Sequence, residues 1–295
     1  MKVISLLNDK GGVGKTSSSV NLSVMIAKKI KDKGGRVLLI DVDPQGNTSM
    51  ILNQMDVMNI LTNVITGENT QHGYTVQDLF INAELNIHET IKKTRIDNLD
   101  IIPSLLTLSE IEELLKADVR TPQQFRLRKH LKAIENEYDY CLIDCSPSVN
   151  ILNINALAAS HEVFIPCRPD AYSAIGLVIV KRLIDTVQDY NPELEIGGYY
   201  YTPWNGRKNI SRQVHAILNA YMPDKFVPVV IPQNKFVEEM SITQKTLLDM
   251  DKNIKHATTR GFWELAQYII DNQSKRKNYR NENTKQFDLL IENIE

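Results

Sequence analysis

Short, continuous apolar runs alternate along this chain with longer stretches in which apolar residues recur at helical spacing. The runs are rich in Val, Ile and Leu, and runs of this length are typical of strands buried on both faces of a sheet. They predict strands at residues 3–7, 36–42, 99–103, 140–144, 163–167, 196–201 and 226–231. The stretches between them predict helices at residues 17–33, 105–116, 122–136, 153–159 and 173–190.

Alternation of strands and helices favours an α/β fold. We expect a single doubly wound, mostly parallel sheet of about seven to eight strands flanked by helices. The 295 residues could form one large domain or two small ones, and we predict one domain over residues 1–270. Residues 271–295 form a basic and then acidic tail. Residues 53–72 are polar with little periodicity, and residues 75–93 carry two short helical patterns.

Carboxylates stand at the ends of two predicted strands. Asp41 and Asp43 lie at and just after the end of the strand at 36–42, and Asp144 ends the strand at 140–144. Doubly wound sheets bind ligands at the carboxyl ends of their strands. Carboxylates there bind Mg²⁺, usually through its water shell. We therefore expect Asp144 to take part in a magnesium site.

The first predicted strand breaks into a glycine-rich loop, KGGVGKT at residues 10–16, and a helical pattern follows at once. Backbone N–H groups at a helix N-terminus carry partial positive charge, and an anion approaches them closely where side chains are absent. In this context Lys15 would reach the β- and γ-phosphates of a nucleotide, and the Thr16 hydroxyl would ligate Mg²⁺. The alternative interpretation is a tight turn with solvated lysines.

The loop departs from the common eight-residue phosphate-binding pattern, because Asp9 stands where that pattern has Gly. Instead Lys10 opens the loop, five positions before Lys15. With this pair of lysines the sequence resembles the deviant-Walker ATPases of the ParA/MinD group, and within them the ParA/Soj partition proteins. Further similarity lies in DVDPQGN at 41–47 and in DCSPS at 144–148, where Ser146 replaces a proline.

The resemblance implies a P-loop NTPase fold and a slow, Mg²⁺-dependent ATPase with ATP and Mg²⁺ as cofactors. Lys10 would cross an ATP-dependent homodimer to the partner's phosphates, comparable to an arginine finger, a device worth roughly 10³–10⁵ in rate. Asp43 would orient the attacking water, and Asp41 would support Thr16 and Asp144 around Mg²⁺. The residues implied to hold the nucleotide are Lys10, Gly11, Gly12, Val13, Gly14, Lys15, Thr16 and Ser17.

The resemblance also implies a role in plasmid or chromosome partition, in the cytoplasm and at the nucleoid. The ATP-bound dimer would bind double-stranded DNA without sequence preference, and a ParB-like centromere-binding protein would stimulate hydrolysis. A net charge of −2 supplies no global positive field, so DNA binding needs a local patch. The candidate DNA-binding residues are Arg207, Lys208, Lys235, Lys275, Arg276 and Lys277.

Three alternatives stay open. A MinD-like regulator of cell division that cycles on membranes would need a basic amphipathic C-terminal helix, whereas residues 287–295 are apolar and acidic, so we expect no membrane partner. An iron–sulfur protein similar to nitrogenase reductase would need cysteines in surface loops, whereas the three cysteines lie in or beside predicted strands as buried free thiols. A catalytically silent scaffold would not need intact lysines and carboxylates. The cysteines are Cys141, Cys145 and Cys167.

Overall fold

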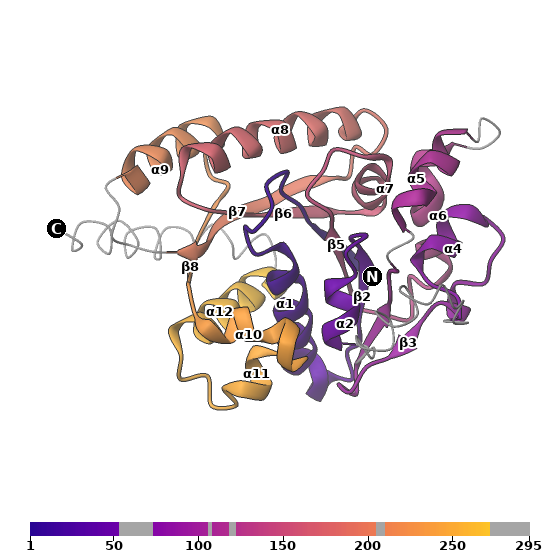
Figure 1. Cartoon of the computed structure of the whole chain (residues 1–295), viewed down its shortest axis with the longest axis horizontal. Coiled ribbons are helices and arrows are strands. Elements are labelled where there is room, and N and C mark those ends of the chain that lie inside the picture. The colour runs from indigo at the N-terminus through magenta and orange to yellow at the C-terminus, as the bar shows by residue number, and fades with distance from the viewer. Residues whose placement is uncertain (53–72, 106–107, 118–121, 205–209, 272–295) are drawn as a thin grey trace.

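An eight-stranded sheet forms the middle layer of the structure (Figure 1), a computed structural model that describes residues 1–52, 73–105, 108–117, 122–204 and 210–271. The strands lie in the order β3-β4-β2-β5-β1-β6-β7-β8. Every neighbouring pair is parallel except β3 with β4. The strands are β1 (Lys2–Leu6), β2 (Val37–Val42), β3 (Lys92–Lys93), β4 (Leu99–Ile102), β5 (Tyr140–Cys145), β6 (Glu162–Cys167), β7 (Glu195–Trp204) and β8 (Phe226–Pro232). The predicted doubly wound sheet is confirmed, and all seven predicted strands form.

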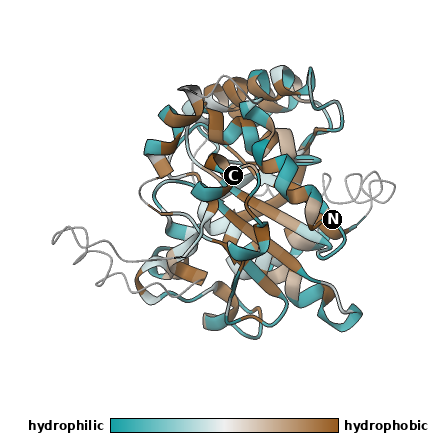
Figure 2. Cartoon of the chain, turned by 90° about the vertical axis from the view of Figure 1, so that its right-hand side faces the viewer, coloured by the Kyte–Doolittle hydropathy of each residue, from teal (hydrophilic) through white to brown (hydrophobic). Residues whose placement is uncertain are grey.

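Helices cover both faces of the sheet. One face carries α1 (Lys15–Ile30), α2 (Asn47–Leu52), α10 (Lys235–Thr243), α11 (Leu247–Met250) and α12 (Ala257–Ile270). The other face carries α4 (Val76–Ile81), α5 (Leu108–Ala117), α6 (Arg126–Ala133), α7 (Ile151–Ala159), α8 (Ala171–Gln188) and α9 (Ile210–Tyr221). Each layer encloses its own hydrophobic core against the sheet, and Figure 2 shows the hydrophobic strands between the two layers.

The central strands β2, β5, β1 and β6 are almost entirely buried, which explains their continuous apolar sequences. Their parallel register aligns Leu6 with Asp144 and Asp41 with Asp144, so the loops after these strands meet at one edge. The chain leaves β1 for the α1 face and leaves β5 for the α7 face. Because neighbouring loops turn to opposite faces, a crevice opens between them, which is where doubly wound sheets bind ligands.

Two parts of the fold differ from the prediction. Residues 92–93 form β3, an antiparallel edge strand, although the sequence indicated only helical patterns in this region. Residues 257–270, for which the sequence predicted no element, form α12, and this helix buries Phe262 and Leu265 in the core. Residues 53–72 and the tail beyond residue 271 lie outside the described residues, so their predicted character stays a prediction.

Candidate functional site

The loop between β1 and α1 presents bare backbone. Gly12 and Gly14 adopt left-handed φ angles of 70° and 83°, which favour glycine. A Cβ on Gly14 would lie 3.3 Å from the Thr202 side chain. Gly14 is also the N-cap of α1, and no side chain caps that helix start. The first N–H groups of α1 are therefore left open, as an anion-binding helix N-terminus requires.

Lys15 is the first residue of α1, and its side chain folds back along the loop. Its side chain is buried, and Nζ donates a hydrogen bond of 2.9 Å to the carbonyl oxygen of Lys10. Burial lowers the pKa of Lys15, while Asp144 and Asp43 partly oppose this shift by favouring the charged form. A buried ammonium group between two carboxylates and a row of open amides is suited to bind a phosphate group.

Asp144 is the penultimate residue of β5, close to the start of α1, and is fully buried. It accepts hydrogen bonds from Ser19 Oγ at 2.8 Å and from Thr48 Oγ1 at 2.6 Å, and the nearby Thr16 hydroxyl also favours its charged form. Burial raises the pKa of Asp144, and these hydroxyl groups partly offset the shift. The cluster brings together Thr16 and Asp144, two of the three residues predicted to surround Mg²⁺, and that role stays a prediction.

Asp41 lies beside Asp144 on the neighbouring strand and is also fully buried. One carboxylate oxygen accepts hydrogen bonds from Ser49 Oγ at 2.6 Å and Ser49 N at 2.9 Å, and the other accepts from the Asp43 amide at 3.1 Å. Burial and the neighbouring Asp144 both raise the pKa of Asp41. The structure thus places Asp41 under the turn that carries Asp43, and its part in the magnesium shell stays a prediction.

Asp43 follows β2 and faces the crevice, with 7% of its surface exposed. Its Oδ1 accepts a 2.9 Å hydrogen bond from the Gln45 amide, and its carbonyl oxygen accepts one from Ser104 Oγ at 3.0 Å. Burial raises the pKa of Asp43, opposed by the Gln45 amide and the charge of Lys15. One oxygen of the carboxylate is thus held by a backbone amide, and the role of Asp43 in orienting water stays a prediction.

Lys10 points away from the other loop residues. Its Nζ lies 3.0 Å from both carboxylate oxygens of Asp170, the N-cap of α8, and 5.7 Å from the centre of the Tyr172 ring. The hydrogen bonds from Lys10 and from the Ser173 amide outweigh the effect of burial and hold the pKa of Asp170 below its usual value. In the single subunit, therefore, the charge of Lys10 is paired outside the crevice.

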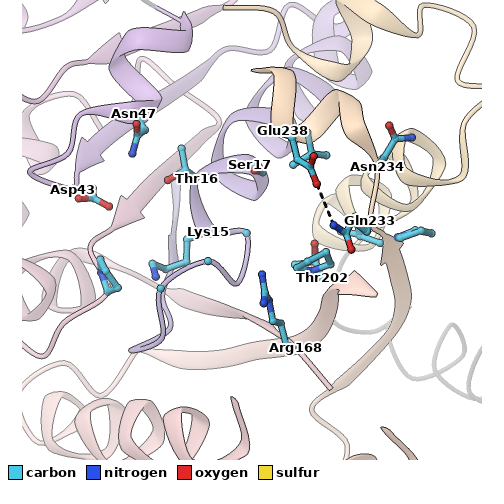
Figure 3. Close-up of a pocket in the computed structure, with 18 residues that line it drawn as sticks. Lys15, Thr16, Ser17, Asp43, Asn47, Arg168, Thr202, Gln233, Asn234 and Glu238 are labelled. Carbon is cyan, nitrogen blue, oxygen red and sulfur yellow. Dashed lines mark hydrogen bonds between the residues drawn. The ribbon is translucent and has the colours of Figure 1, made fainter. Parts of the chain in front are cut away.

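A pocket of about 360 Å³ occupies the crevice (Figure 3), a volume suited to a small-molecule ligand. One wall is the loop and the start of α1, together with Asp43 and Asn47. The opposite wall consists of residues near the ends of β7 and β8, the two residues after β8 and residues from α10. That wall is formed by Thr202, Pro203, Ile231, Pro232, Gln233, Asn234, Val237 and Glu238. Its four apolar residues, Pro203, Ile231, Pro232 and Val237, form the apolar wall opposite the phosphate-binding side.

Most of the predicted nucleotide-binding residues line this pocket together with the predicted catalytic residue Asp43, namely Gly11, Gly12, Gly14, Lys15, Thr16 and Ser17. Lys10, Val13, Asp41 and Asp144 do not line it. Sequence reasoning missed the apolar wall and Arg168, and it included Asn47 and Pro147 only as members of the motifs at 41–47 and 144–148. The signal for Arg168 and for most of the apolar wall was their place at or just after the ends of predicted strands, since such positions gather at the binding edge.

Among the candidate DNA-binding residues, only Lys235 falls within the described ranges. It is the first residue of α10 and is exposed, with Nζ 5.7 Å from the centre of the Phe236 ring. Arg207, Lys208, Lys275, Arg276 and Lys277 lie outside the described residues. The three cysteines are buried and free, as predicted.

The donor set fits a magnesium nucleotide better than a metal ion alone. Within the described residues, no group of three or more His, Cys, Asp and Glu side chains could hold a metal ion. Mg²⁺ in nucleotide sites takes one or two protein ligands and completes its shell with water and phosphate oxygens. Thr16 and Asp144 match that requirement. None of the described helices is long and apolar enough to span a membrane.

Comparisons with known proteins identify the family of this chain. A family profile described as an AAA domain matches residues 1–196. The chain is 35% identical to the chromosome partitioning protein ParA of Caulobacter vibrioides over 94% of this chain and 97% of that protein. It is 34% identical to the sporulation initiation inhibitor protein Soj of Bacillus subtilis over 92% of this chain and 99% of that protein.

Two solved structures share the fold at low identity. Cobyrinic acid a,c-diamide synthase from Mycobacterium smegmatis with ADP and magnesium has a TM-score of 0.69 at 23% identity, covering 92% of this chain and 94% of that one. MinD from Pyrococcus horikoshii with Mg-ADP has a TM-score of 0.69 at 22% identity, covering 91% and 95%. The two-lysine loop, the doubly wound sheet and the identity to ParA and Soj over nearly the whole chain show that this chain belongs to the ParA/Soj family of P-loop ATPases.

Proposed function

We propose that the protein is a ParA-type partition ATPase that binds Mg-ATP in the crevice and hydrolyses it as a homodimer. The observation that carries the proposal is the contrast between the two loop lysines. Lys15 is buried in the crevice, whereas Lys10 lies outside it in a partly exposed ion pair. This arrangement supports one lysine that serves its own nucleotide and another that is available to a partner subunit.

The chain's residues divide the work as follows. The open amides of the loop and Lys15 bind the phosphates, and Thr16 with Asp144 holds Mg²⁺, which neutralises developing charge when bound. The apolar wall around Pro203 and Pro232 receives the adenine. Asp43 orients the attacking water, and Lys10 supplies charge to the partner's transition state. Because Lys10 arrives only in the dimer, hydrolysis is slow at low protein concentration.

We expect Lys15→Ala to weaken ATP and ADP binding by about 10- to 100-fold, because a charge-assisted hydrogen bond to phosphate is lost from a buried site. Isothermal titration calorimetry with each nucleotide in Mg²⁺ buffer measures the effect. Lys28→Ala is the matched control, since Lys28 lies on the same helix and is exposed. Equal affinities for the wild type and Lys15→Ala would contradict the proposed binding mode.

The dimer then binds DNA without sequence preference, and a ParB-like centromere-binding protein stimulates hydrolysis and release, at the nucleoid in the cytoplasm. Support comes from the relatives named for chromosome partitioning and from exposed Lys235. The MinD likeness is one of fold alone. A membrane-cycling role is therefore kept as an outcome of the next experiment.

We expect random duplex DNA to be retained with ATP but not with ADP, and retention to weaken by orders of magnitude between about 50 and 200 mM salt. Lys235→Ala reduces the slope of log affinity against log salt concentration by about one, as expected for the loss of one phosphate contact. Lys28→Ala leaves this slope unchanged. Sedimentation with anionic liposomes runs beside the DNA assay. Pelleting with liposomes and no DNA retention would select the membrane-cycling alternative.

A further inference from the structure

Arg168 is a cation in the pocket that neither the sequence resemblance nor the roles above account for. It directly follows Cys167, the last residue of β6, on the strand next to β1. It lines the pocket, and Nη2 lies 3.6 Å from the position of a Cβ built on Gly12. Figure 3 shows its side chain directed into the pocket between the glycine loop and Thr202.

The guanidinium group has no counter-charge in the single subunit. Its Nε is shielded from solvent and lacks a hydrogen-bond partner among the described residues. Within the described ranges no carboxylate forms an ion pair with it. A shielded N–H without a partner is unfavourable, and an anion that enters the pocket would supply the counter-charge that the guanidinium group lacks.

The surroundings identify the part of the ligand that it meets. On the loop side Arg168 faces Gly12 and, with Lys15, flanks the open amides. The apolar wall with Pro203 and Pro232 lies on the other side of the pocket. Guanidinium groups bind phosphate oxygens through two parallel hydrogen bonds, which suits the loop side and not the apolar side.

We propose that Arg168 is a second cationic contact for the phosphates of the nucleotide bound by its own subunit. The nucleotide is then held from two directions, by the loop after β1 and by the residue after β6. This inference rests on the proposed function. Unlike Lys10, Arg168 acts in the ground state and within one subunit, so it affects ADP and ATP alike.

The test compares Arg168→Gln with the wild type in titrations of ADP, ATP and inorganic pyrophosphate. We expect about tenfold weaker binding of all three, the loss of one charge-assisted contact. Arg168→Lys keeps the positive charge but lacks the two parallel N–H donors of the guanidinium group, so we expect a smaller loss of affinity. Arg128→Gln is the matched control, because Arg128 is exposed and lies beside a different pocket near residue 1 at the other end of β1.

Three outcomes overturn the inference. The first is wild-type affinity of Arg168→Gln for pyrophosphate. The second is a loss confined to ATP-driven dimerisation, measured by sedimentation, which would place the contact across the subunit interface. The third is wild-type affinity of Arg168→Lys for ADP and pyrophosphate. This outcome decides the test if a thermal melt shows that Arg168→Gln does not fold. A wild-type protein that binds no nucleotide would instead refute the proposed function, and Lys15→Ala in the same series separates the two failures.

Discussion

We expect Lys10→Ala to lower ATP turnover by about 10³-fold or more, in line with the loss of an arginine finger that acts from a partner subunit. The cause is the missing positive charge at the partner's transition state. ADP affinity stays at the wild-type level, because Lys10 does not line its own pocket. Phosphate release at saturating Mg-ATP, measured across a protein concentration series, gives the rate. The wild-type rate per subunit rises with concentration, and that of the variant does not.

Lys181→Ala is the control for this prediction. Lys181 pairs with Asp185 on α8, and its side chain is 30% exposed, against 29% for Lys10 in its pair with Asp170. The two substitutions therefore remove comparable ion pairs. If Lys10→Ala and Lys181→Ala hydrolyse ATP at the same rate, Lys10 has no catalytic role in trans.

The second large effect concerns Asp43→Ala, for which we expect turnover to fall by about 10²–10⁴-fold, the range for a group that positions or accepts a proton. ATP-dependent dimerisation is retained, because Asp43 contacts neither Lys15 nor Thr16 through a hydrogen bond among the described residues. Size-exclusion chromatography with ATP and a phosphate-release assay separate these two properties.

Asp43→Asn sharpens the test, because the amide oxygen still accepts the hydrogen bond from the Gln45 N–H but carries no charge. Both variants remain folded: burial raises the pKa of Asp43, so its charge is unfavourable in the folded protein. Wild-type turnover by Asp43→Ala would refute its role in hydrolysis.

The sheet was predictable because its strands are buried on both faces and leave continuous apolar runs. β3 was not, since Lys92 and Lys93 form a two-residue edge strand with no apolar pattern. α12 was not predicted either, although Phe262 and Leu265, three positions apart, lie on the helix face toward the core.

The phosphate side of the site was also predictable, because the loop and its helix are contiguous in sequence. The apolar wall was not, because it joins the segments at 202–203 and 231–238, whose Thr, Pro, Gln and Val residues carry no signature singly. Arg168 escaped notice for the same reason. Only the register of β6 beside β1 brings it to the glycine loop.

The ion pair between Lys10 and Asp170 bears on how the proposed dimer would assemble. Ion pairs this open to solvent contribute at most about 1 kcal/mol, so exchanging one counter-ion of Lys10 for another costs little. In the proposed dimer, a triphosphate across the subunit boundary would carry more negative charge than the Asp170 carboxylate and would bind Lys10 in its place. Without a triphosphate at the boundary, Lys10 of each subunit would stay paired with its own Asp170. The weak Lys10–Asp170 ion pair would thereby make dimerisation depend on whether the pocket holds a nucleoside triphosphate.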